Sequence, residues 1–141
     1  MKRFAPRILV LAICACVLMY GCDGWTNVKY QKKLKGRYYL LATDVEEQMD
    51  ICMKVSSNGY TTIVDETVYE VGYDSNFIVA IQHPMNNKNV NAYYIIKMDS
   101  TRAEPLANNT LGPLTFQQFY QKRKDLGIED IGFSLVFADL K

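Results

Sequence analysis

The sequence contains few of the residues that most often carry catalysis or bind metals. It has one histidine, four cysteines, four prolines and eight glycines among 141 residues. It contains no glycine-rich phosphate loop, no dinucleotide-binding fingerprint and no nucleophile-elbow spacing. A formal net charge of +1 excludes a strongly basic nucleic-acid-binding protein, so no nucleic-acid partner is expected. These absences leave a single small globular domain as the expected class.

The sequence also lacks a hydrophobic run long enough to span a membrane. Its longest uncharged apolar run, residues 8–20, would form a helix about 20 Å long, whereas the hydrocarbon core is about 30 Å thick. The run follows Lys2, Arg3 and Arg7, and no acidic residue occurs before Cys22. A basic start followed by a short apolar stretch is typical of an export signal peptide.

The end of this segment, LMYGC at residues 18–22, resembles the lipobox of bacterial lipoproteins in the loosened form of Bacteroides-type bacteria. The resemblance implies a signal peptide over 1–21 and a Cys22 that is acylated on sulfur, for instance with palmitate. The domain would then lie outside the cytoplasm, in the cell envelope, anchored to a membrane through lipid. Two alternatives stay open, namely a signal peptide cleaved elsewhere and an uncleaved anchor.

The cysteines have different predicted fates. Cys14 and Cys16 lie inside the apolar run and would leave with the signal peptide. If Cys22 carries lipid, Cys52 is the only thiol of the mature protein, so neither a disulfide nor a zinc site is expected. Cys52 is either a buried, inert side chain or a thiol made reactive by the nearby Lys54.

Residues 22–35 are predicted to be a lipidated tether, because they lack sustained periodicity and are rich in lysine. Those lysines either face solvent or favour anionic headgroups near the membrane. The folded domain is predicted over 36–141.

Strand patterns dominate the domain. Apolar and aromatic residues, alternating in several segments, predict strands over 37–43, 49–55, 60–64, 67–73, 76–82, 92–98 and 131–137. Residues 83–91 and 99–112 are expected to be irregular. The short connections indicate an α+β fold, with one curved antiparallel meander sheet of six or seven strands.

A single helix is predicted over 114–127, packed on a face of this sheet. Thr115 and Gln118 have the spacing of a capping box, and Gly127 suits a left-handed helix end. Phe116 and Phe119 contribute to an apolar stripe with helical spacing.

Candidate catalytic groups are scarce. His83 precedes Pro84 and is either a turn residue or a proton-transferring base. Carboxylates gather at 44–50 and 65–70, where they are either solvated charges or the acids of a hydrolase. No metal and no cofactor are expected.

The ten tyrosines suggest a binding surface, since tyrosine buries a large area and keeps a polar tip. Neighbouring tyrosines in a strand face opposite sides of the sheet, so some lie outside the core; core and sheet stabilisation is the alternative explanation. The candidate binding residues are Tyr73, Gln82, His83, Tyr93 and Tyr94.

Five segments of the chain, taken in order, resemble a family of small uncharacterised bacterial lipoproteins. These segments are YYLLATD, EQMDI, ETVYEVGYDSNFIVAIQHP, YYIIKM and GPLTFQQF. The resemblance covers about three-quarters of the chain, and it implies the fold and an envelope location but no activity. The expected function is that of a non-enzymatic binding or accessory domain for an unknown envelope protein or glycan. The alternative is a small envelope hydrolase that uses carboxylates or His83.

Overall fold

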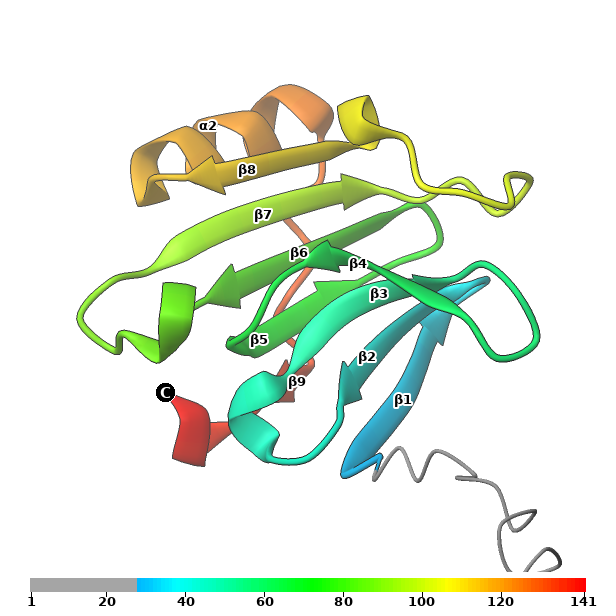
Figure 1. Ribbon diagram of the computed structural model, residues 1–141. Helices are drawn as coiled ribbons and strands as arrows, with labels where there is room; N and C mark the ends of the chain where they lie inside the picture. The colour runs from blue at the N-terminus through cyan, green and yellow to red at the C-terminus, as the bar shows by residue number, and fades with distance from the viewer. Residues whose placement is uncertain (1–27) are drawn as a thin grey trace, which may run out of the picture.

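The computed structural model describes residues 28–141, so the predicted signal peptide and the predicted lipidation at Cys22 lie outside the described residues. The described chain forms two antiparallel sheets and one α-helix (Figure 1). No helix in this part of the chain is long and apolar enough to cross a membrane.

The first sheet has the strand order β1-β2-β3-β4, and the second has the order β8-β7-β6-β5-β9. The strands of the first sheet are β1 (Tyr30–Lys35), β2 (Tyr38–Ala42), β3 (Asp50–Lys54) and β4 (Tyr60–Val64). Those of the second are β5 (Val68–Tyr73), β6 (Phe77–Gln82), β7 (Ala92–Lys97), β8 (Thr110–Leu114) and β9 (Leu135–Val136). The helix is α2 (Phe116–Leu126), and the 3-10 turns are η1 (Glu46–Gln48), η2 (Pro84–Asn86), η3 (Ala107–Asn109) and η4 (Ala138–Leu140).

The α+β class and the antiparallel pairing are confirmed, but the prediction of one continuous meander is wrong. The meander breaks between β4 and β5, which belong to different sheets. After β4 the chain turns at residues 65–67, and Thr67 pairs with His83 through two backbone hydrogen bonds of 2.8 and 3.2 Å. The backbone N–H of Val68 donates to Met49 O at 2.8 Å, so the first sheet stays attached at this crossing.

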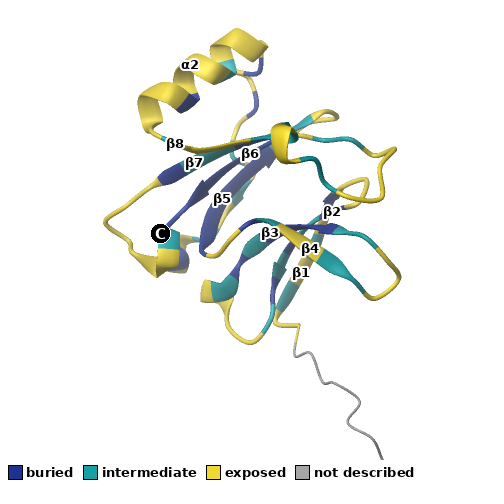
Figure 2. Cartoon of the chain, turned by 45° about the horizontal axis from the view of Figure 1, so that its top comes forward, coloured by how far each residue is buried: buried dark blue, intermediate teal, exposed yellow. Residues whose placement is uncertain are grey.

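The two sheets enclose the main hydrophobic core. Leu40, Ile51 and Met53 contribute from the first sheet, and Val71 and Ile78 from the second. Because side chains alternate along a strand, β6 also contributes to a second core on its other face. Figure 2 accordingly shows β5 and β6 as largely buried.

The second core lies beneath α2 and is formed by Val79, Ile95, Phe119, Ile128 and Ile131. Phe119 is the buried residue of the helix itself, and most of α2 is exposed (Figure 2). The helix therefore covers the outer face of the second sheet, against β7 and β8, as the packing of a helix on one face predicted.

The local signals of the helix are confirmed. Gln118 N–H donates to Thr115 Oγ1 at 3.3 Å, and Thr115 N–H donates to Gln118 Oε1 at 2.9 Å, which closes the capping box. Gly127 ends the helix with a φ of 64°, the left-handed conformation that glycine adopts without strain.

The predicted boundary between tether and domain is wrong, because the sheet begins at Tyr30 rather than after residue 35. β1 pairs with β2, and Leu34 is buried in the main core. β1 lacks the apolar pattern of a buried strand because it is an edge strand, rich in lysine, whose side chains are mostly solvated. The sequence therefore did not predict it.

Candidate functional site

The contact between Tyr94 and Gln82 is the centre of the candidate site. Tyr94 O–H, from β7, donates to Gln82 Oε1 at 3.0 Å. Gln82, at the end of β6 and 4% exposed, donates from Nε2 to the backbone oxygens of Asp65 and Glu66 at 2.8 and 2.9 Å. These bonds attach residues 65–67, where the chain crosses between the sheets, to β6 of the second sheet. They also hold the Tyr94 hydroxyl in place.

Two recesses meet at Tyr94 and Asp65, and we refer to them together as the Tyr94 groove. The first has a volume of about 450 Å³ and runs between β4 and the segment around η3 and β8; it is lined by Thr62, Ile63, Val64, Asp65, Tyr94, Pro105, Leu106, Ala107, Thr110 and Gly112. The second has a volume of about 400 Å³ and is lined by Asp65, Glu66, Gln82, Pro84, Met85, Tyr94 and Pro113. Each volume lies in the range usual for ligand sites, about 300–1,000 Å³.

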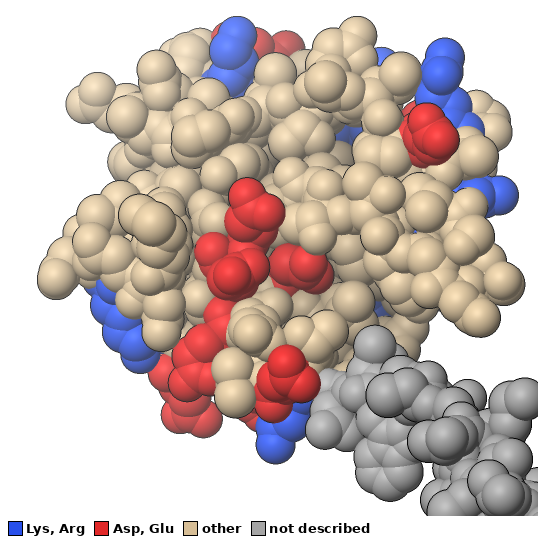
Figure 3. Space-filling view, in the orientation of Figure 1, with Lys and Arg blue, Asp and Glu red and all other residues tan. Residues whose placement is uncertain are grey.

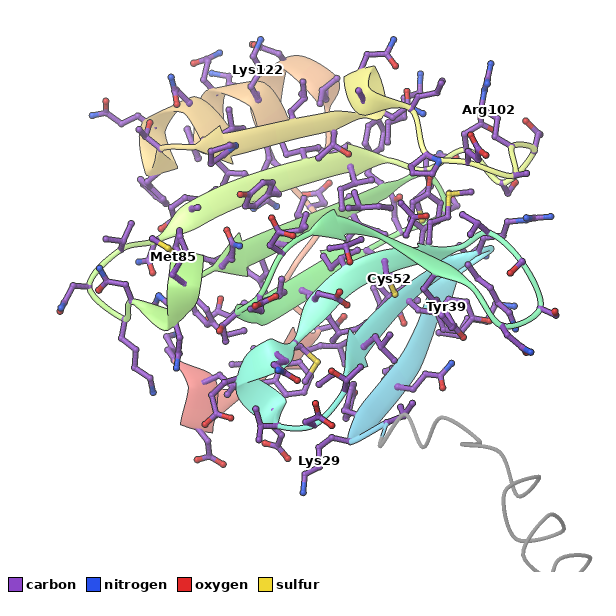
Figure 4. All side chains as sticks on the ribbon, in the orientation of Figure 1. Lys29, Tyr39, Cys52, Met85, Arg102 and Lys122 are labelled. Carbon is purple, nitrogen blue, oxygen red and sulfur yellow. The ribbon has the colours of Figure 1, made fainter. Side chains whose placement is uncertain are left out.

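The groove combines apolar surface with carboxylates at its centre. Tyr94 is half-buried, and burial, followed by the charge of Asp65, raises the pKa of its hydroxyl. The hydroxyl therefore stays protonated and remains a donor to Gln82. Met85 is 92% exposed and projects from the loop between β6 and β7 (Figure 4).

Gln82 and Tyr94 are the two predicted binding residues that line this groove. Tyr73 is the last residue of β5 and pairs with Ile78, whereas Gln82 pairs with Val68, the first residue of β5. Tyr93 points to the other face of the sheet, where its ring centroid lies 5.1 Å from that of Phe119. The structure therefore separates these two tyrosines from the groove.

His83, the remaining candidate, is enclosed in the domain and only 3% exposed. Its Nδ1 lies 2.9 Å from Val90 O, and its ring stacks on Tyr69 with a centroid distance of 4.1 Å. Its Nε2 is buried and has no hydrogen-bond partner among the described residues. His83 thus contacts the following loop through Val90 and is covered by Tyr69, which separates it from the Tyr94 groove.

The sequence did not indicate the other parts of the groove. The backbone oxygens of Asp65 and Glu66, which Gln82 binds, leave no signal in residue types. The segment around η3 was predicted to be irregular, and only the fold brings it opposite β4. Met85, next to Pro84, has a φ of 51°, which shows how sharply the loop turns there.

Asp65 and Glu66, which line the groove, form a cluster of carboxylates with Asp50 on the face that Figure 3 shows. Asp50 lines a smaller recess of about 160 Å³ together with Glu66, Gln48, Thr43 and Leu41. Burial raises the pKa of Asp50 to about 6, while a hydrogen bond from Thr62 opposes the shift and the charges of Glu66 and Asp65 add to it. Asp50 therefore exchanges its proton closer to neutral pH than an aspartate in water does.

Cys52 is buried, 1% exposed, and faces the backbone oxygen of Tyr39 at 3.7 Å. Burial, followed by the charge of Asp50, raises the pKa of its thiol to about 12. A thiol that stays protonated is a poor nucleophile and metal ligand, which favours the inert interpretation. Across residues 28–141, no group of three or more histidine, cysteine and acidic residues is placed to hold a metal ion.

A family model described as "Protein of unknown function (DUF3997)" matches residues 29–139. The match covers both sheets and the helix, which together form the whole described domain. No curated protein and no solved structure matches the chain.

Proposed function

Since the chain belongs to this family of unknown function, we propose its role from its own residues: a lipoprotein, anchored through Cys22, whose domain binds an envelope protein or glycan in the Tyr94 groove without catalysing a reaction. One observation carries the binding role. The hydrogen bond to Gln82 fixes the Tyr94 hydroxyl, so the ring is already ordered where two ligand-sized recesses meet. A side chain that is already ordered loses little entropy when a partner binds.

The chemistry of the groove suits a glycan or an extended peptide. An aromatic face binds the apolar face of a sugar or an aliphatic side chain, and carboxylates accept hydrogen bonds from hydroxyl or amide groups. Asp65 and Glu66 supply such carboxylates beside Tyr94.

The alternative, a hydrolase that uses carboxylates or His83, has less support. His83 is enclosed by Tyr69 and the following loop. The recess at Asp50 has a volume of about 160 Å³, smaller than most ligand sites. Both observations favour binding over turnover.

The binding role predicts that Tyr94→Ala lowers affinity for the envelope ligand at least about fivefold, since a buried aromatic contact contributes more than about 1 kcal/mol. The native protein and the variant would be compared on fragments of peptidoglycan and surface polysaccharide by calorimetry. Tyr73→Ala is the matched control, because Tyr73 lies at the far end of β5. Equal affinities of the two variants, or hydrolysis of a fragment, would count against the proposal.

The anchor predicts that Cys22→Ser moves the protein from the membrane to the soluble fraction and removes the mass of the acyl chains. Cys52→Ser is the control and should fractionate like the native protein, since Cys52 is buried in the domain. Unchanged fractionation and mass of Cys22→Ser would refute the anchor and leave the groove hypothesis untouched.

A further inference from the structure

A separate pocket of about 420 Å³ lies at one end of the first sheet, where the β1–β2 turn meets the loop after β3. Its lining shares no residue with the Tyr94 groove: Lys33, Gly36, Arg37, Tyr39, Lys54, Val55, Ser56 and Ser57. Three of these side chains are basic, three carry hydroxyl groups (Tyr39, Ser56 and Ser57), and none carries a carboxylate.

The strand pairing brings the three basic side chains together. Gly36, with a φ of 55°, forms the turn that returns the chain from β1 into β2. Lys33 then lies opposite Tyr39, and Lys54 N–H donates to Arg37 O at 2.8 Å across the next pair of strands. Because these positions are fixed by backbone pairing, the cluster of positive charge is a property of the sheet.

The charges of this pocket are not neutralised by nearby acids. Within residues 28–141 the ion pairs are Arg102–Asp99 and Lys141–Glu70, and neither involves a residue of the pocket. Like charges gathered in a concave site raise the local potential and attract anions.

Tyr39 is the aromatic residue that lines the pocket, and the neighbouring Tyr60 contacts Lys54. Its Nζ lies 5.9 Å from the centroid of the Tyr60 ring, within the range of a cation–π contact. Tyr60 packs edge-on against Tyr39 with 5.5 Å between centroids, and its hydroxyl accepts a hydrogen bond from Gln31 Nε2 at 2.8 Å. Figure 4 shows Tyr39 on the side of the first sheet near the loop after β3.

We propose that this pocket binds a phosphate-bearing ligand. A phosphate group offers several acceptor oxygens, which match a planar guanidinium, two ammonium groups and two serine hydroxyls. Tyr39 offers an apolar face to the organic group attached to the phosphate. A soluble phosphate ester and a phospholipid headgroup present the same chemistry, and the pocket is defined by what they share.

The test uses the full chain in neutral detergent micelles. Amide resonances of residues 33–39 and 54–57 are followed while glycerol phosphate or inorganic phosphate is added. In a second arm, the micelles are doped with phosphatidylglycerol or with phosphatidylcholine. Saturable shifts confined to these amides support the proposal. Shifts with glycerol phosphate or inorganic phosphate identify a soluble ligand, and shifts with phosphatidylglycerol alone identify a headgroup.

The double variant Arg37→Gln/Lys54→Gln should lower this affinity at least about tenfold, because it removes two charge-assisted hydrogen bonds. Lys122→Gln/Lys124→Gln makes the same change in charge on the exposed surface of α2, where Lys122 is well separated from Tyr39 (Figure 4), and should keep the affinity within about twofold. Lys33→Gln, at an exposed position of β1, repeats the test should the double variant fail to fold. An equal loss in the pocket and helix variants, or no shift at the pocket amides in either arm, would overturn the proposal.

Discussion

Replacing Gly72 with alanine is expected to destabilise the domain by about 3 kcal/mol or more. Gly72 lies in β5, opposite Val79 of β6. A Cβ at this position would overlap the backbone oxygen of Gly132, would lie 2.9 Å from the carbonyl carbon of the same residue, and would crowd Val79 at 3.2 Å. Since the nearest obstacle is backbone, no change of rotamer relieves the overlap.

The segment that would have to move is important for the second core. After α2 the chain passes behind the second sheet on its way to β9 (Figure 1). Along this path Ile131 and Phe133 pack beneath the helix, and Ser134 N–H donates to Val71 O at 3.1 Å. Displacing the segment would open a void in this core and stretch that bond, which explains the size of the expected effect.

Urea denaturation of the two glycine variants measures this effect. Gly132→Ala is the matched control, because no heavy atom lies within 4 Å of the added methyl group and the residue is exposed. We expect the control to stay within about 0.5 kcal/mol of the native protein. A Gly72→Ala variant as stable as the control would contradict the packing described for β5.

The helix shows which features could be predicted from sequence. Thr115, Gln118 and Gly127 act within a few residues of one another, and the predicted cap and helix end are confirmed. Apolar and aromatic patterns also located β2 to β7. Such local signals do not depend on the rest of the fold. The strand predicted over 131–137 is wrong in its extent, because only Leu135–Val136 pair with β5 to form β9.

Two edge strands could not be recognised in this way. β1 is rich in lysine, and β8 contains Gly112 and Pro113, which disfavour a central strand. Both strands lie at the edge of a sheet, where one side needs no hydrogen-bond partner. Their pairing depends on β2 and β7, so it appears only in the folded chain.

The division into two sheets also depends on distant contacts. A short connection such as residues 65–67 is compatible with a hairpin or with a crossing between sheets. The crossing is selected by Gln82, which binds the backbone of Asp65 and Glu66, and by the pairing of Thr67 with His83. For the same reason, the sequence identified Gln82 and Tyr94 as candidates but not the groove that they line.

Stability is expected to fall as the pH rises from about 4 to about 6, because of Asp50. Its Oδ2 accepts a hydrogen bond from Thr62 Oγ1 at 3.0 Å, whereas its Oδ1 is buried without a partner among the described residues. Burial, reinforced by the charges of Glu66 and Asp65, raises the pKa of this carboxyl from its ordinary 3.8 to about 6.

The sign follows from the proton that the native state retains. Between pH 3.8 and 6 the unfolded chain has lost the proton of Asp50, while the folded chain still holds it. Folding is therefore favoured at low pH, and this contribution is lost as the pH passes through the folded-state pKa. A fully buried group with this shift would contribute about 3 kcal/mol, and solvent near the half-buried Asp50 reduces the value to about 1–2 kcal/mol.

Asp50→Asn should remove this dependence. The amide oxygen can still accept the hydrogen bond from Thr62, and a neutral side chain avoids repulsion from Glu66 and Asp65. We expect the variant to match the native protein near pH 4 and to exceed its free energy of unfolding by about 1–2 kcal/mol at pH 8. Urea denaturation at pH 4, 6 and 8 measures the difference. Asp130→Asn, at an exposed position after α2, should follow the native curve throughout. An Asp50→Asn curve parallel to the native one would show that Asp50 ionises in the folded domain as freely as in the unfolded chain.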